Sequence, residues 1–255
     1  MANWFSRRLT APGARVQLNQ TEWTIVEEVD RQDLSADEED LRISIEPCYG
    51  YALLLCRPSQ SRETQASAFM RIYLQTPMLN TEGEDPIDRS QQATTYTPSE
   101  LTALQKFTEG GVRYTPRLLD WRSSQQDESR PVPGGFIIWV VWEIVPGIRL
   151  GDDFGGDIFW TLPRSERDAV RSAFEDGYKT LLEYGYLIEF GRAKNLVWDR
   201  ETQRLYFVGF WRCGIHPSDR WTPKAFVTFN LVKTPRLRRM LSDPDWDGDP
   251  QNWEF

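Results

Sequence analysis

The segment "LIEFGRAKNLVW" (187–198) places a single asparagine, Asn195, between a charged loop and a short apolar stretch. It follows the strongest helical pattern in the chain, "SERDAVRSAFEDGYKTLLEYG" (165–185), where apolar residues recur every 3.6 residues up to a natural stop at Gly185. The residues after it, "NLVWDRETQRLYFVGF" (195–210), read as two strands joined by a polar turn. The pattern therefore predicts a long helix, a loop and a hairpin.

The first half of the chain is strand-like. Short apolar runs between polar turns predict strands at 22–29, 41–47 and 51–57. In "ASAFMRIYLQ" (66–75), alternation predicts that one face carries Ala68, Met70, Ile72 and Leu74, and the other Phe69, Arg71 and Tyr73. The run "GGFIIWVVWEIVPG" (134–147) predicts a buried strand, and we expect the boundary between two lobes close to its end.

Two segments lie between these strands. Residues 78–96 are polar and patternless, which predicts a mobile loop. "TPSELTALQKF" (97–107) predicts a helix, with Thr97 as its cap, Pro98 at its first position and Glu100 completing a capping box.

Composition excludes several classes of protein. The 255 residues carry a net charge of −8 without a basic run, which argues against nucleic-acid binding. The longest apolar run (136–142) is too short to cross a bilayer, and no signal peptide is evident, so we expect no membrane association and no secretion. Cys48, Cys56 and Cys213 are scattered and odd in number, which favours reduced thiols in a cytoplasmic protein. The single histidine, His216, rules out a multi-histidine metal site, and we read it as a structural loop residue.

The order of these elements, with several local motifs, resembles the protein-kinase-like superfamily, over roughly residues 22–241. It is most similar to small fungal kinase-like proteins and to the aminoglycoside-phosphotransferase branch. The resemblance implies an α+β, two-lobed fold: a β-rich N-terminal lobe (1–145), an antiparallel sheet with one helix, and a mainly helical C-terminal lobe (146–255) with an acidic tail.

In this superfamily a strand lysine holds the ATP phosphates and pairs with a glutamate of the next helix. Here "AFMRIY" looks like that strand, with Arg71 in place of the lysine, and Glu100 looks like its partner. The alternative is that Arg71 is an edge-strand charge and Glu100 only a capping carboxylate. "WVVWEIVPG" resembles the strand that links the lobes, which would put Glu143 near the adenine edge.

The catalytic positions are altered. Counting back from Asn195, Ile188 stands at the position of the family's histidine and Phe190 at that of the aspartate that accepts the substrate proton. In "YFVGFW", Gly209 replaces the metal-binding aspartate and Trp211 the glycine of the Asp-Phe-Gly motif. The glycine-rich phosphate loop is also missing. The resemblance therefore implies that phosphoryl transfer has been lost, and we expect neither cofactor nor metal.

Two further motifs are interpreted as structural. Asp153-Phe154-Gly155 spells the kinase metal motif, but it precedes the long helix, so we read it as an acidic linking loop. The tail from Asp243 to Glu254 matches the EF-hand calcium loop position for position, yet it contains Pro250 and is followed by no helix, which favours a solvated tail; calcium binding stays open.

Two readings of function remain. In the first, the cleft between the lobes has become an apolar pocket for a small organic molecule, in a cyclase or tailoring enzyme of secondary metabolism. The second is a non-catalytic pseudokinase that binds a protein partner through the loop 78–96 and the acidic tail. The candidate catalytic residues of the first reading are Arg71, Glu189 and Asn195, and its pocket residues are Glu100, Glu143, Phe190, Arg192, Lys194, Gly209, Phe210 and Trp211. Substrate, reaction and oligomeric state are not determined by the sequence.

Overall fold

The computed structural model describes residues 4–36, 47–61, 67–152, 154–214, 220–234, 251 and 253–255. The chain divides into two compact units, the first being Met1–Leu101 with Arg117–Ile144 and the second Thr102–Pro116 with Val145–Phe255. The division after Ile144 lies one residue before the expected boundary, but the sequence placed 102–116 in the first lobe.

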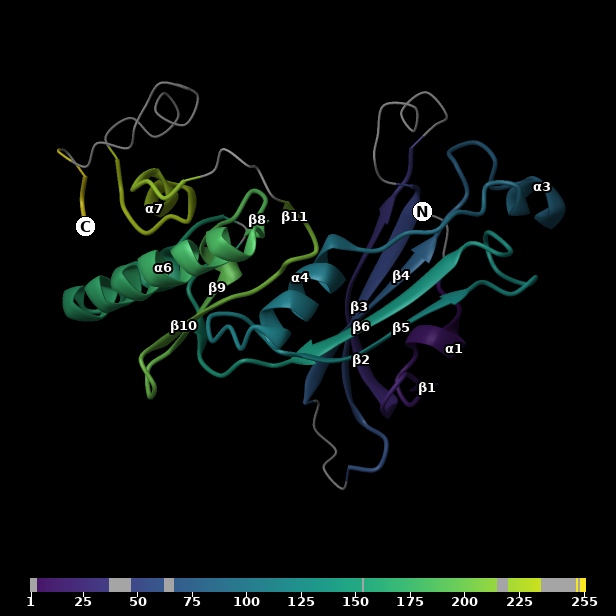
Figure 1. Cartoon of the computed structure of the whole chain (residues 1–255), viewed down its shortest axis with the longest axis horizontal. Helices are drawn as coiled ribbons and strands as arrows, with labels where there is room; N and C mark the ends of the chain where they lie inside the picture. The colour runs from purple at the N-terminus through teal and green to yellow at the C-terminus, as the bar shows by residue number, and fades with distance from the viewer. Residues whose placement is uncertain are drawn as a thin grey trace. The chain divides into compact units, whose positions relative to one another are not determined.

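The first unit is an antiparallel sheet of six strands, ordered β1-β2-β3-β4-β6-β5 (Figure 1). The strands are β1 (Arg15–Gln17), β2 (Glu22–Leu34), β3 (Tyr49–Pro58), β4 (Ala68–Gln75), β5 (Leu118–Gln125) and β6 (Phe136–Glu143). A short helix, α1 (Arg7–Thr10), precedes them. Six of the seven residues of the strand predicted at 41–47 lie outside the described residues.

The predicted alternation of β4 is confirmed. Its residues Ala68, Met70, Ile72 and Leu74 join the hydrophobic core on one face of the sheet, together with Ile137 from β6. The opposite face carries Arg71 and Tyr73, and both are buried as well. Because β4 lies between β3 and β6, both of its hydrogen-bonding edges are also paired.

The segment 78–96 is not the patternless loop that its sequence predicted. It contains a short helix, α3 (Pro86–Ser90), and its two ends are joined through Gln92. The Gln92 side chain accepts a hydrogen bond from the Met78 N–H (2.9 Å) and donates one to Thr81 Oγ1 (2.9 Å). These contacts join residues 11 to 14 positions apart, so no local sequence pattern announces them.

A boundary between the two units falls within helix α4 (Ser99–Glu109), after Leu101. The predicted capping box is absent, because both oxygens of the Glu100 carboxylate bond to β4 side chains. The later part of the helix packs in the second unit, where the Phe107 ring lies 5.2 Å from that of Phe210. The Tyr184 hydroxyl also donates to the Gly110 carbonyl, which explains why 102–116 group with this unit.

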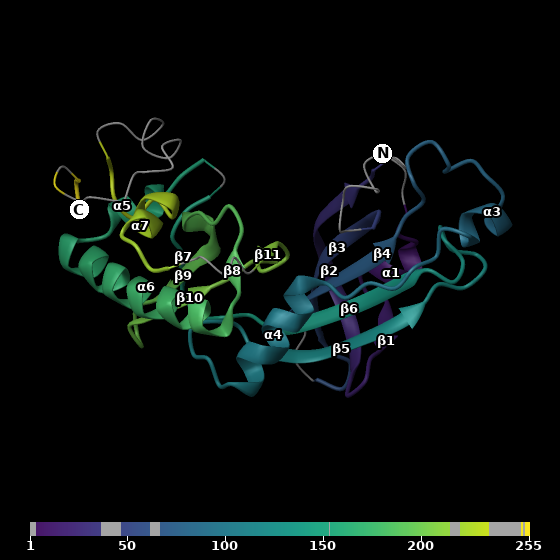
Figure 2. The ribbon, with the colours of Figure 1, turned by 45° about the horizontal axis from the view of Figure 1, so that its top comes forward.

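The second unit is built around the predicted long helix, α6 (Arg164–Tyr184), which ends at Gly185. Beside it lies an antiparallel sheet ordered β10-β9-β7 (Figures 1 and 2). The other elements are short. They are β7 (Ile148–Arg149), α5 (Asp157–Thr161), β8 (Leu187–Ile188), η1 (Ala193–Asn195), β9 (Leu196–Asp199), β10 (Arg204–Phe207), β11 (Cys213–Gly214) and α7 (Lys224–Thr228).

An aromatic cluster forms the centre of this unit. The ring of Phe174 on α6 lies 4.9 Å from Phe229, 5.3 Å from Phe207 and 5.5 Å from both Tyr178 and Phe226. Since Phe207 ends β10 and Phe229 follows α7, the cluster joins the helix to the hairpin that leads into Gly209.

Some predictions fall outside the described residues: those on Asp153, on His216 and on the acidic tail from Asp243 to Pro250. Within the described residues, Glu254 forms an antiparallel bridge with Lys233. In that same part of the chain, no helix combines the length and the hydropathy needed to cross a membrane.

Candidate functional site

The first candidate site is a buried ion pair within the first unit. Arg71 stands on β4, opposite Leu53 of β3 and Val140 of β6. Its Nη1 donates to Oε1 of Glu100 at 2.5 Å, and only 5% and 2% of the two side chains are exposed. The Tyr73 hydroxyl donates to the other carboxylate oxygen at 2.8 Å. The structure thus brings together the two residues that the sequence paired, and the edge-strand and capping-box alternatives are wrong.

Aromatic rings enclose this pair. The Arg71 Cζ lies 4.8 Å from the centre of the Tyr51 ring and 5.3 Å from that of Trp142, distances at which cation–π attraction is significant. Burial alone would lower the pKa of Arg71, but the Glu100 carboxylate outweighs this effect, and the pKa lies above its ordinary value. Burial, with the same carboxylate, also raises the pKa of the Tyr73 phenol. The guanidinium therefore stays charged, and the phenol stays protonated as a donor.

A separate candidate site, in the second unit, centres on Asn195, at the end of η1. Its Oδ1 accepts the Arg192 N–H (3.1 Å), and its Nδ2 donates to the Val208 carbonyl (2.9 Å). The backbone carbonyl of Asn195 accepts the Val208 N–H at 2.8 Å. The side chain thus connects the loop before β9 to the end of the hairpin.

The backbone of Gly209 lies beside the Asn195 side chain. Its φ of +87° lies in the left-handed region, which residues with a Cβ seldom adopt. A Cβ here would lie 2.7 Å from Nδ2 of Asn195, closer than any ordinary contact. The position that would carry a metal-binding aspartate therefore has no room for a side chain unless Asn195 moves.

Phe190 and Glu189, which stand at and beside the position of the family's catalytic acid, are not placed as we predicted. Phe190 has a φ of 53° and is 80% exposed, so within its unit it does not line an apolar pocket as we expected. Glu189 is exposed too, its N–H donates to the Arg212 carbonyl, and its carboxylate lies so close to Gly214 that a Cβ there would be 2.7 Å from Oε1. Neither side chain is positioned as a buried general base.

The remaining predicted residues have structural contacts. Phe210 is buried against Phe107 rather than open to a ligand. The Trp211 ring lies 4.8 Å from the Arg212 guanidinium, and the Lys194 carbonyl accepts a hydrogen bond from Arg149. In the first unit, Glu143 receives both the N–H and the Nε–H of Arg117. Arg192 is exposed, and its backbone N–H is held by Asn195.

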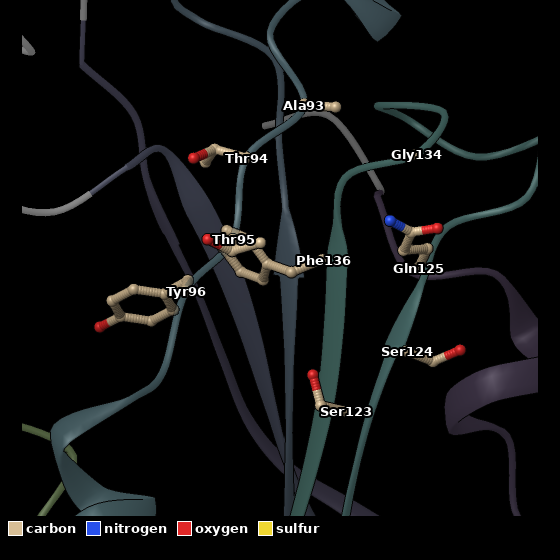
Figure 3. Close-up of a pocket in the computed structure, with 9 residues that line it drawn as sticks. All are labelled: Ala93, Thr94, Thr95, Tyr96, Ser123, Ser124, Gln125, Gly134 and Phe136. Carbon is tan, nitrogen blue, oxygen red and sulfur yellow. The ribbon is translucent and has the colours of Figure 1, made fainter.

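Sequence reasoning missed a pocket of about 430 Å³ in the first unit (Figure 3). It is formed by the end of the segment predicted as a mobile loop, by the end of β5 and by the start of β6. The lining residues are Ala93, Thr94, Thr95, Tyr96, Ser123, Ser124, Gln125, Gly134 and Phe136. The only local signal is the concentration of hydroxyl residues in "ATTY" (93–96) and "SSQ" (123–125), which is also typical of exposed loops.

No protein-family model matches the chain, and no curated protein matches its sequence. Solved structures do resemble it. They include the PK-1 kinase of Cydia pomonella granulovirus (11% identity, TM-score 0.37, 75% of this chain and 55% of that one). They also include the bifunctional kinase-methyltransferase WbdD (15%, 0.42, 84% and 39%) and vaccinia related kinase 3 (13%, 0.37, 80% and 52%). The chain spans between 39% and 55% of the length of these structures, and the likeness concerns the fold alone.

The features of the chain itself define the class. A helix inserted between the fourth and fifth strands of an antiparallel sheet carries a glutamate that pairs with a buried strand cation, and the sheet is followed by a long helix, an asparagine loop and a hairpin. The fold is α+β and protein-kinase-like, as the sequence predicted.

Proposed function

We propose that this kinase-like protein does not transfer phosphoryl groups and acts as a binding module. The observation that carries the proposal is the contact between Gly209 and Asn195. A Mg²⁺ ion bridging nucleotide phosphates needs one or two carboxylates, and a side chain at position 209, where one of them would stand, would collide with the Asn195 amide. Phe190, at the position of the proton acceptor, can neither carry charge nor accept a proton.

The polar side chains that a small-molecule pocket would need already form hydrogen bonds within the protein. Glu100 is bonded by Arg71 and Tyr73, and both ends of the Asn195 amide are used by the backbone. These contacts support binding rather than chemistry as the role of the fold. The cytoplasmic location and the protein partner expected from the sequence stay predictions. The helix α3, where Ile87 is 77% exposed, lies within the expected contact segment 78–96.

The protein is expected to show no Mg²⁺-dependent stabilisation by ATP. A ligand at a hundred times its dissociation constant would stabilise the fold by about 2.7 kcal/mol, which thermal unfolding detects readily. The measurement compares buffer, ATP, and ATP with Mg²⁺. A shift that requires Mg²⁺, or transfer of the γ-phosphate to protein or water, would contradict the proposal.

Gly209→Asp is expected not to restore Mg²⁺–ATP binding and to lower the free energy of unfolding by about 1–3 kcal/mol, because it forces a Cβ into a left-handed position against Asn195. Urea unfolding measures the loss. Gly209→Ala is the matched control, since it carries the same backbone strain without the carboxylate. If Gly209→Asp gained a Mg²⁺-dependent ATP shift that Gly209→Ala lacked, the site would need only one carboxylate to function, and the proposal would fail.

A small-molecule tailoring enzyme is the second candidate. The observation in its favour is a charged pair with a neighbouring phenol, buried under the Tyr51 and Trp142 rings. Within the described residues, the buried Nε of Arg71 also has no hydrogen-bond partner. A panel of organic acids and ketones would be incubated with the protein and followed by mass spectrometry. Turnover that falls at least tenfold in both Arg71→Lys and Tyr73→Phe would favour this candidate, and an absence of turnover would leave the binding module.

A further inference from the structure

The pocket of the first unit is separate from every residue discussed for phosphoryl transfer. Its one wall is the segment 93–96, and its other wall is the end of β5. In Figure 3, Phe136 lies between the threonines and Tyr96 on one side and Ser123, Ser124 and Gln125 on the other. Ser123 and Gln125 stand opposite Ile138 and Phe136 in the β5–β6 register, so both project to the same face of the sheet as Phe136.

The lining is polar but uncharged. Among the described residues around the pocket there is no Asp, Glu, Lys, Arg or His. The side chains of Thr94, Thr95, Ser123, Ser124 and Gln125 form no hydrogen bond with any other described residue, so their hydroxyl and amide groups face solvent. Such groups can donate to and accept from a ligand, but they cannot neutralise a phosphate or a carboxylate.

An aromatic surface completes the pocket. The Tyr96 ring lies 5.1 Å from that of Phe136 and is stacked on Tyr49 at 5.3 Å. Neighbouring rings thus hold Tyr96 from two sides. An aromatic face beside a set of hydroxyl and amide groups suits a molecule with both C–H and O–H surfaces.

Two buried glutamines position the walls. Gln75 accepts the Thr94 N–H (3.1 Å) and donates to the Gln92 carbonyl (2.7 Å), which fixes the chain as it enters 93–96. Gln126 donates to the carbonyls of both Gln75 and Phe136 (2.9 and 3.0 Å). The two side chains are 3% and 5% exposed. Gly135 allows this packing, since a Cβ there would lie 2.5 Å from Oε1 of Gln75. The walls are therefore held in place before any ligand arrives, which lowers the entropic cost of binding.

From these observations we propose that the pocket binds an uncharged, polyhydroxylated molecule the size of one sugar ring. The hydroxyl groups of Thr95 and Ser123 and the Gln125 amide exchange hydrogen bonds with the ligand hydroxyls, and Tyr96 packs against the ring. The pocket shares no residue with the positions discussed for Mg²⁺–ATP binding. The test of sugar binding and the test of the proposed function can therefore fail separately.

The test is a titration of the ¹⁵N-labelled full chain with the methyl glycosides of glucose, galactose and mannose at millimolar concentrations. At least one is expected to shift the amides of 94–96 and 123–125. Glucose 6-phosphate is expected to bind more weakly, because no cationic side chain is among the residues that line the pocket. Ser123→Ala and Thr95→Ala should each weaken binding roughly fivefold, the effect of one lost hydrogen bond. The matched control Thr180→Ala, a hydroxyl removed from α6, should leave binding unchanged.

The proposal fails if none of the three glycosides shifts these amides. It also fails if the shifts persist unchanged in both pocket variants. Finally, it fails if glucose 6-phosphate shifts these amides more strongly than the uncharged glucoside does. A neutral tetrapeptide serves as the competing probe, because β5 is an edge strand of the sheet. Shifts along β5 with the peptide but not with the sugars would replace a sugar site by a peptide site.

Discussion

Glu100→Gln is expected to destabilise the first unit by about 3–5 kcal/mol, because it leaves the Arg71 guanidinium buried without a counter-charge. The substitution preserves shape and can still accept a hydrogen bond, so the loss reports the missing charge. A second variant that replaces both partners, Arg71→Met with Glu100→Leu, is expected to recover most of the stability, since apolar residues of similar volume often substitute well for a buried pair.

Urea unfolding followed by tryptophan fluorescence measures both effects. Glu143→Gln is the matched control, because Glu143 pairs with an arginine whose side chain is 68% exposed and should lose at most about 1 kcal/mol. If Glu100→Gln cost no more than this control, Arg71 would have to be solvated, and the buried pair described for the site would be wrong. The double variant Arg71→Met with Glu100→Leu also separates stability from function. It keeps the fold but removes both charges, so any ligand binding that depends on these charges would be lost.

Phe174→Ala is expected to destabilise the second unit by about 3–5 kcal/mol, because it removes the ring at the centre of the aromatic cluster. The neighbouring rings belong to β10 and to the chain around α7, so collapse around the cavity would require elements from three parts of the sequence to move together. The same change should loosen the end of the hairpin, where Val208 is held by Asn195.

Phe154→Ala is the control for this variant: the same side chain is deleted at a position that is 96% exposed, and the expected change is within about 0.5 kcal/mol. Hydrogen exchange at the Val208 and Asn195 amides would report the loosening directly. Equal stability of the two variants would mean that Phe174 is not at the centre of the core, contrary to the contacts described.

The Arg71–Glu100 pair shows how a buried cation can stabilise this fold. Arginine remains charged on burial, and its planar group can lie against aromatic rings while it bonds to a carboxylate. Here it ties α4 to the middle of the sheet under Tyr51 and Trp142. The pair is thus a structural tie between this helix and the sheet.

Local periodicity was sufficient for the regular elements of this chain. The alternation of 66–75, the apolar run of β6 and the 3.6-residue pattern of α6 each follow from which side chains a strand or helix must bury, and all three were predicted correctly. The order of these elements and several local motifs resemble the protein-kinase-like superfamily, and that resemblance implied the class of fold and the pairing of Arg71 with Glu100 across 29 positions.

Only the tertiary structure decided the rest. The walls of the pocket depend on Gln75, Gln92 and Gln126, whose side-chain hydrogen bonds reach residues 6 to 51 positions away. The contact of Asn195 with Gly209 and the exposure of Phe190 depend in the same way on how η1 meets the hairpin. Periodicity reports which face of an element is buried, but a polar side chain shows its partner only after the chain has brought distant segments together.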